Sequence, residues 1–153
     1  MIRWLAAFAG LMPKRHSSLM SLARAEAVGF GHEYVGTEHL LLAMAGRKGS
    51  AAARALASHG VARKVLLAEI RKSVQPGLGE VPERELPCNP YAKRTIERSI
   101  EEARRLEHDL LEQEHVLLAL LTDQESVAVE VLTRLGVGLD LLRAAVLKEA
   151  GWL

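Results

Sequence analysis

Two helix starts in this sequence carry side chains suited to binding an anion and a cation together. The first reads Gly36-Thr37-Glu38-His39 and leads directly into the apolar run 40–42. A helix N-terminus presents free N–H groups to an anion, and the Thr37 hydroxyl adds a further polar group. The Glu38 carboxylate can pair with a guanidinium, so Gly36, Thr37 and Glu38 suit a ligand that carries both phosphate and guanidinium. A structural role explains the same residues equally well, with Thr37 capping the helix and Glu38 complementing its dipole.

The second helix start, Glu112-Gln113-Glu114-His115, keeps only part of this arrangement. Glu112 stands where the first copy has Gly36, and its additional carboxylate repels an anion. Gln113 replaces the threonine hydroxyl with a longer amide. We therefore expect Gln113 and Glu114 to bind such a ligand poorly, or to bind something else.

Two histidine pairs are the next candidates for chemistry. His32 and His39, and likewise His108 and His115, are seven residues apart, a spacing that aligns two rings on one continuous helix. A helix start falls between the members of each pair, however, and no third metal ligand is evident. We expect no metal site, and instead expect His39 and His115 to face the interior and hydrogen-bond across the loop.

Catalytic motifs are missing from the sequence. It contains no G-x-x-x-x-G-K-[ST] phosphate loop and no Gly-x-Ser-x-Gly nucleophile turn. Cys88 precedes a predicted helix N-terminus, a position that lowers a thiol pKa, although an incidental thiol is the simpler interpretation. We therefore predict no enzymatic activity and no cofactor.

Composition excludes several other classes of protein. The 153 residues are 49% hydrophobic and 25% charged, as in ordinary globular proteins, and the net charge of +1 argues against a nucleic-acid partner. Cys88 is the only cysteine, so no intrachain disulfide can form and a reducing, cytoplasmic location is expected. The apolar stretch 4–12 is too short to span a bilayer. We interpret residues 1–12 as a lead-in that packs on the body or frays, with a weak interfacial anchor as the alternative.

The elements that must position these residues occur twice. A shift of 76 residues aligns the chain with itself without a gap, and about a third of positions 26–70 are identical. The matches include Glu26-Ala27 with Glu102-Ala103, His32 with His108, Glu38-His39 with Glu114-His115, Leu41-Leu42-Ala43 with Leu117-Leu118-Ala119, and Gly60-Val61 with Gly136-Val137. Such a regular match indicates an internal duplication.

Each copy contains signals for four helices and none for an alternating strand. The first helices are predicted at about 14–28 and 90–106, and the second begin at Thr37 and Gln113. The third begin at the N-cap residues Ser50 and Ser126 and end before Gly60 and Gly136, and the fourth span about 61–73 and 139–150. The prolines, glycines and acids after residue 74 predict an exposed linker.

These observations predict an all-α fold of two pseudo-twofold four-helix repeats, eight helices in all. The expected organisation is a lead-in at 1–12, a first repeat at 13–74, a linker at 75–88 and a second repeat at 89–150. The repeats should pack against each other because four short helices bury little surface alone.

The doubled motif resembles the Clp N-terminal repeat domain, most closely that of the ClpC type, over about residues 13–150. The residues that carry the resemblance are Glu26-Ala27, Gly31-His32, Gly36-Thr37-Glu38-His39 and Gly60-Val61 in the first copy, with Asn89-Pro90, Glu114-His115 and Gly136-Val137 in the second. The resemblance implies an all-helical domain that docks substrates and adaptors for ATP-dependent proteolysis. It also implies phosphoarginine-binding residues at Gly36, Thr37 and Glu38, and in reduced form at Gln113 and Glu114.

The resulting functional hypothesis is a non-enzymatic module that binds peptides, degrons or adaptors in the Clp protease system. Because the sequence ends at Leu153 without an ATPase module, it resembles a stand-alone accessory or decoy partner of a ClpC-like unfoldase. Expected partners are that unfoldase, its substrates or adaptors, and phosphoarginine-bearing proteins. The alternative is a Clp-independent scavenger or sensor that binds a small molecule or peptide in the groove between the repeats.

Overall fold

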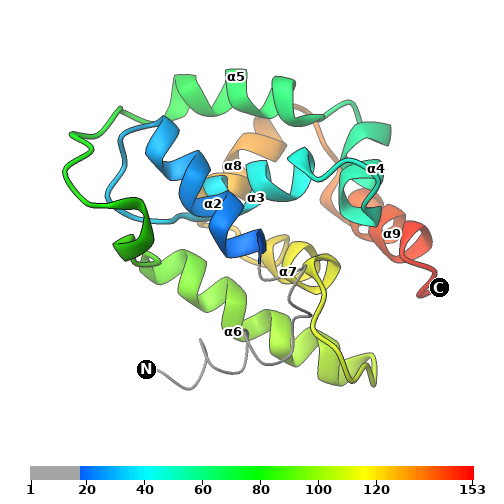
Figure 1. The fold of residues 1–153 in the computed structure, drawn as a ribbon. Coiled ribbons are helices and arrows are strands. Elements are labelled where there is room, and N and C mark those ends of the chain that lie inside the picture. The colour runs from blue at the N-terminus through cyan, green and yellow to red at the C-terminus, as the bar shows by residue number, and fades with distance from the viewer. Residues whose placement is uncertain (1–17) are drawn as a thin grey trace.

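The computed structural model describes residues 18–153, which form eight α-helices in two sets of four (Figure 1). The first set is α2 (Ser18–Gly29), α3 (Thr37–Gly46), α4 (Ala51–Ser58) and α5 (Arg63–Ser73). The second set is α6 (Pro90–Arg105), α7 (Gln113–Leu120), α8 (Val127–Arg134) and α9 (Leu139–Glu149). The all-α prediction is therefore confirmed. The lead-in at 1–12 and the first turn of the earliest predicted helix lie outside the described residues.

Local sequence signals account for where several helices begin. The Ser50 hydroxyl accepts a hydrogen bond from Ala53 N–H at 3.1 Å, and the Ser126 hydroxyl accepts one from Val129 N–H at 3.2 Å. Asn89 caps α6 in the same way, with Pro90 in the first helical position. Side chains of this kind satisfy N–H groups that have no acceptor within their own helix.

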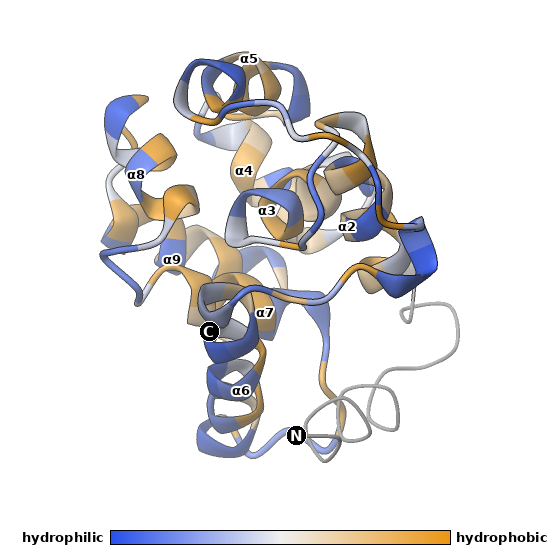
Figure 2. Ribbon diagram, turned by 90° about the vertical axis from the view of Figure 1, so that its left-hand side faces the viewer, coloured by the Kyte–Doolittle hydropathy of each residue, from blue (hydrophilic) through white to orange (hydrophobic). Residues whose placement is uncertain are grey.

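The two repeats pack around α3 and α7, the second helix of each. Every residue of α7, and all of α3 except its last glycine, is buried. The reciprocal contacts of α4 with α9 and of α5 with α8 confirm the pseudo-twofold arrangement, as do those of α3 with α8 and of α4 with α7. In Figure 2, α3 and α7 lie inside while α6 turns a hydrophilic face outward. Helices that are apolar on all sides belong in a core, which is where these two lie.

The linker between the repeats is exposed over much of its length but is attached at both ends. Near its start, Gly77 N–H donates to the Phe30 carbonyl at 2.9 Å. A Cβ atom at Gly77 would lie 2.2 Å from the carbonyl oxygen of Gly31, so the two backbones can approach only as glycines. Near its end, Val35 forms an isolated bridge with Cys88. The linker thereby holds the loop that precedes α3, in addition to connecting the repeats.

The linker also contributes to the interior, which its composition did not predict. It contains a short 3₁₀ helix, η1 (Glu83–Glu85), and the side chain of the following Leu86 is buried in the core.

Among the helices that the structure describes, none combines the length and the apolar character that a membrane-spanning helix needs.

Candidate functional site

The residues predicted to bind a ligand lie in the interior. Thr37 and Glu38 at the start of α3 are each 1% exposed, while Gln113 and Glu114 at the start of α7 are 2% and 5% exposed. Gly36, which precedes α3, is buried as well. A ligand could reach these groups only if the surrounding contacts opened.

Each repeat supplies a hydrogen-bond acceptor to the third helix of the other repeat. The Ala128 N–H at the start of α8 donates to the Thr37 hydroxyl oxygen at 3.2 Å. The Ala52 N–H at the start of α4 donates to Glu114 Oε2 at 2.9 Å. Both N–H groups belong to a first helical turn, which has no acceptor within its own helix. Thr37 and Glu114 therefore act as caps across the interface, a role that no spacing within one repeat indicates.

This exchange breaks the symmetry between the copies and leaves two buried oxygen atoms without partners. Thr37 and Glu114 do not occupy equivalent positions, since Thr37 corresponds to Gln113 and Glu38 corresponds to Glu114. Of the residues that the structure describes, Glu38 Oε1 and Gln113 Oε1 are the buried side-chain oxygens without a hydrogen bond. Leaving such an acceptor unpaired costs about 1–3 kcal/mol, so both positions are of functional interest.

Glu38 folds back over Gly36. A Cβ atom at position 36 would lie 2.0 Å from Glu38 Oε1, so only glycine leaves room for the side chain. Burial raises the pKa of Glu38, although its own backbone N–H and the nearby His32 oppose that shift. In the second repeat Glu112 stands at the position of Gly36, and the Glu114 carboxylate extends across the interface instead.

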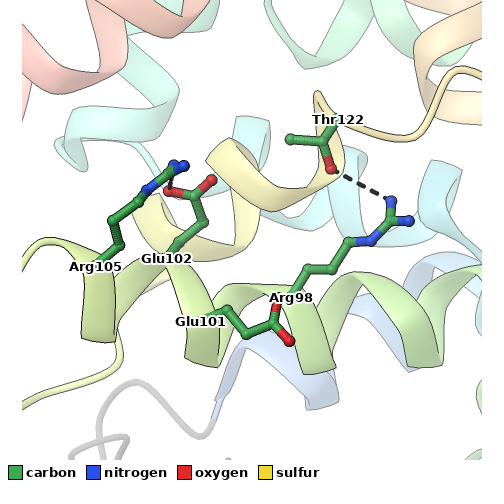
Figure 3. A pocket seen from close by; sticks show the side chains of 5 residues that line it. All are labelled: Arg98, Glu101, Glu102, Arg105 and Thr122. Atoms are coloured by element: carbon green, nitrogen blue, oxygen red, sulfur yellow. Dashed lines mark hydrogen bonds and ion pairs between the residues drawn. The ribbon is translucent and has the colours of Figure 1, made fainter.

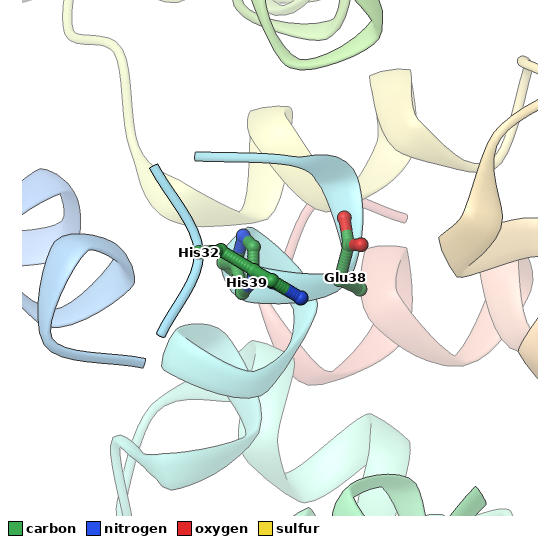
Figure 4. A group of neighbouring side chains, drawn as sticks. All are labelled: His32, Glu38 and His39. Carbon is green, nitrogen blue, oxygen red and sulfur yellow. Dashed lines mark hydrogen bonds between the residues drawn. The ribbon is translucent and has the colours of Figure 1, made fainter. Parts of the chain in front are cut away.

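The side chains of His32 and His39 lie close together in the first repeat (Figure 4), and they belong to a hydrogen-bonded chain that defines their tautomers. Gly36 N–H donates to His39 Nδ1 at 2.8 Å, so the neutral His39 ring carries its hydrogen on Nε2. That N–H donates to His32 Nδ1 at 2.9 Å, and His32 Nε2–H donates in turn to the Gln75 carbonyl at 2.7 Å. The pKa of His39 is lowered to about 3, mainly because the ring is buried and to a smaller extent because His32 lies beside it.

The second repeat contains the same arrangement. Glu112 N–H donates to His115 Nδ1 at 2.9 Å, and His115 Nε2–H donates to His108 Nδ1 at 2.8 Å. The Trp152 ring stacks on His115 with centroids 4.3 Å apart. The pKa of His115 is lowered to about 4, mainly because the ring is buried and to a smaller extent because His108 lies beside it. In both repeats a histidine in the first helical turn reaches back to the N–H that precedes its helix, as Glu or Gln does in a capping box.

The geometry around His39 favours this chain over a metal site. Ligand atoms of His32, Glu38 and His39 lie within 4.8 Å of one another, as a metal site would require. The lone pair of His39 Nδ1 accepts from Gly36 N–H, however, and the lone pair of His32 Nδ1 accepts from His39. Coordination through His39 Nε2 would move a proton to Nδ1, where it would oppose the backbone N–H of Gly36.

The environment of Cys88 is opposite to that of a reactive thiol. Burial raises the pKa of Cys88 to about 11, and the nearby Arg24 offsets only part of that shift. The expectation that the adjoining helix N-terminus lowers this pKa is therefore wrong, because desolvation of the thiolate dominates.

A polar cleft lies along α6, at residues that the sequence did not single out as a site. Its volume is about 420 Å³ and it is lined by Arg98, Glu101, Glu102, Arg105 and Thr122 (Figure 3). The four α6 residues recur at spacings of three and four, which places them on one helix face. Arg98 donates to the Thr122 hydroxyl at 3.3 Å, and Glu102 pairs with Arg105. Acids and arginines balance in number here, so the cleft has no net charge.

Comparison with known proteins identifies the relatives of this fold. A profile of the Clp repeat (R) N-terminal domain matches residues 12–109 and again residues 88–152. The chaperone protein ClpB of Oceanobacillus iheyensis is 37% identical over 142 residues, which cover 93% of this chain and 17% of that protein. The chloroplastic chaperone protein ClpC1 of Arabidopsis thaliana is 41% identical over 133 residues, which cover 87% of this chain and 14% of ClpC1. The chain thus matches only a small part of these relatives.

Solved structures show the same fold. The N-terminal domain of ClpD from Arabidopsis thaliana superposes with a TM-score of 0.78 at 21% identity, covering 93% of this chain and 96% of that one. The N-domain of ClpV from Vibrio cholerae gives 0.75 at 16% identity, covering 96% and 89%. The fold and the doubled helix starts thus define an all-helical Clp N-domain. The chain belongs to the Clp repeat (R) N-terminal domain family.

Proposed function

We propose that this chain is a non-enzymatic binding module of the Clp ATP-dependent protease system. It recognises a peptide, a degron or an adaptor in the cytoplasm and acts as an accessory or decoy partner of a ClpC-like unfoldase. The observation that carries the proposal is the family match, which extends through both repeats and includes a ClpC1 relative at 41% identity.

The environments of Cys88, His39 and His115 support a binding role over a catalytic one. The pKa of Cys88 is raised to about 11, so its thiol is protonated at neutral pH. The pKa values of His39 and His115 are lowered to about 3 and about 4, and their ring nitrogens are engaged in the hydrogen-bonded chains. The two histidines stabilise helix starts, and neither they nor Cys88 offer an activated nucleophile or a free base to a substrate.

The first repeat is the better candidate for phosphoarginine. Glu38 has an oxygen without a partner, which suits a guanidinium, and the Thr37 hydroxyl can still donate its own hydrogen to a phosphate while it accepts from Ala128. Glu114 is already committed to Ala52 N–H, and Gln113 has no hydroxyl. Because Thr37 and Glu38 are each 1% exposed, binding in the first repeat requires the packing around the start of α3 to open locally while the hydrogen bond from Ala128 is kept.

A degradation assay tests the proposed function directly. The purified chain is added to a reconstituted ClpC-like unfoldase with ClpP, and turnover of a fluorescent substrate is followed while complex formation is measured by pull-down. An accessory or decoy partner is expected to bind the unfoldase or its substrate and to change the degradation rate in proportion to its concentration. Absence of binding together with an unchanged rate would contradict the proposal.

A further inference from the structure

A groove on the first repeat, away from the buried helix starts, has a distinct chemistry. It lies where the end of α3, the helix α4 and the start of α5 meet, and its volume is about 550 Å³. Its apolar lining consists of Ala45, Ala53, Ala57, Ala62 and Leu67. We call this feature the alanine groove. Small side chains keep its floor low, so there is room for an apolar side chain of a partner.

The rim of the alanine groove is positively charged. Its charged lining residues are Lys48, Arg54, Arg63 and Lys64, and no acid lines it. Arg54 and Arg63 are neutralised by glutamates outside the lining, namely Glu149 at 2.8 Å and Glu26 at 2.8 Å.

The net positive charge of the groove therefore comes from its two lysines. Lys48 and Lys64 are exposed, and neither has an acidic partner among residues 18–153.

The second repeat provides an internal comparison, because it builds the same backbone with different charges. The positions equivalent to Arg54 and Lys64 are Glu130 and Asp140, and the position equivalent to Lys48 is Gln124.

The alanine floor also changes there, since Thr133 stands for Ala57 and Arg143 stands for Leu67. Leu121 and Val129 replace Ala45 and Ala53 with larger apolar side chains. A smaller cleft of about 350 Å³, lined by Asp140 and Arg143 among others, lies at this place. The fold thus demands neither the cationic rim nor the alanine floor, and their combination is particular to the first repeat.

We propose that the alanine groove binds an acidic peptide segment of a partner protein, with an apolar side chain on the alanine floor and carboxylates paired with Lys48 and Lys64. This inference rests on the proposed function and specifies the surface and the class of peptide. Residues 1–17 of the same chain include Arg3, Lys14 and Arg15 and no acid, so their charge does not complement the groove. The apolar floor and the net charge of only +1 favour a peptide over a nucleic acid.

Fluorescence anisotropy with defined peptides tests this inference. The probe is a labelled peptide of about twelve residues in which leucines alternate with Asp and Glu. The reference peptide carries Lys at every acidic position. The double variant Lys48→Glu and Lys64→Glu reverses the free charges of the rim. The variant Ala57→Trp fills the floor without changing charge. The matched control, Arg84→Glu with Arg104→Glu, gives the same change in net charge at exposed residues outside the groove.

The inference predicts that the acidic probe binds and the lysine peptide does not. Exposed ion pairs are individually weak, but reversing two of them replaces attraction by repulsion, so the rim variant should lose about tenfold or more in affinity. Ala57→Trp should lose a similar factor, while the control should stay within about threefold because it alters only long-range, screened attraction. Added salt should weaken binding of the acidic probe.

If the acidic probe binds, three results would still overturn the inference. The first is unchanged binding by the rim variant, and the second is an equal loss in the control. The third is displacement of the probe by a single-stranded oligonucleotide as effective as that by unlabelled acidic peptide, which would indicate a general polyanion surface. If the acidic probe does not bind but other peptides do, the groove assignment fails while the proposed function stands. If no peptide binds and the unfoldase assay is also negative, both fail.

Discussion

The buried histidine chains should make the stability of this protein depend on pH, and His39 allows the effect to be isolated. Its pKa is about 3 in the folded protein against 6.5 for an unperturbed histidine. The unfolded state therefore binds more protons than the native state between these values, so the free energy of unfolding rises with pH in this window. The contribution of His39 to the free energy of unfolding is fully present above pH 6.5 and is lost as the pH falls toward 3.

The size of the stability loss at pH 5 is set mainly by protonation of histidines in the unfolded state. One and a half pH units below 6.5, protonation favours the unfolded chain by about 2 kcal/mol for each histidine that stays neutral in the native state. His115, whose pKa is lowered to about 4, adds a contribution of similar size. Glu38 acts in the opposite direction, because its raised pKa lets the native state take up a proton before the unfolded state does.

The variant His39→Gln removes one titrating group and keeps an acceptor for Gly36 N–H, since Gln serves this role in capping boxes. Urea unfolding followed by circular dichroism at pH 8 and pH 5 gives the loss of stability for each protein. The loss should be smaller by about 2 kcal/mol in His39→Gln than in the unmutated chain. The control His59→Gln replaces a histidine outside both hydrogen-bonded histidine chains, so it separates the effect of His39 from the general effect of removing a histidine. Equal losses in His39→Gln and in the unmutated chain would refute the reasoning.

Three further predictions concern the interface and the linker. Glu114→Ala should lower the free energy of unfolding by about 1–3 kcal/mol in urea titrations because Ala52 N–H loses its acceptor, whereas Glu38→Gln should not lower it, since Glu38 Oε1 has no partner to lose. In calorimetric titration with a phosphoarginine peptide, Glu38→Ala should weaken binding about tenfold or more, and equal losses in Glu114→Ala would contradict the asymmetry. Gly77→Ala should lower the melting temperature, because its Cβ would lie 2.2 Å from a carbonyl oxygen, while Gly29→Ala, with no atom within 4 Å, should not.

The helical architecture follows from signals that act over a few residues. Ser50, Ser126 and Asn89 each cap the helix that directly follows them, so their effect is readable from neighbouring letters. The duplication is equally visible, because matched side chains at a fixed separation imply matched helices. The pairing of the repeats around α3 and α7 follows from the apolar runs that begin at Leu40 and Val116.

Only the tertiary structure decides what the polar residues at the helix starts do. Thr37 was expected to cap its own helix or to meet a ligand, yet its hydroxyl accepts from Ala128, a residue 91 positions away. Cys88 precedes a helix as its position suggested, but burial raises its pKa, and burial depends on segments that are remote in sequence.

The two Glu-His pairs show the same division. The sequence by itself determined that each pair begins a buried helix and that the first copy has Gly36 where the second has Glu112. It did not determine that Glu38 folds back without a partner while Glu114 reaches across to Ala52. Helix starts depend on local backbone and side-chain preferences, whereas the partner of a buried carboxylate depends on which chain segments meet when the two repeats close on each other.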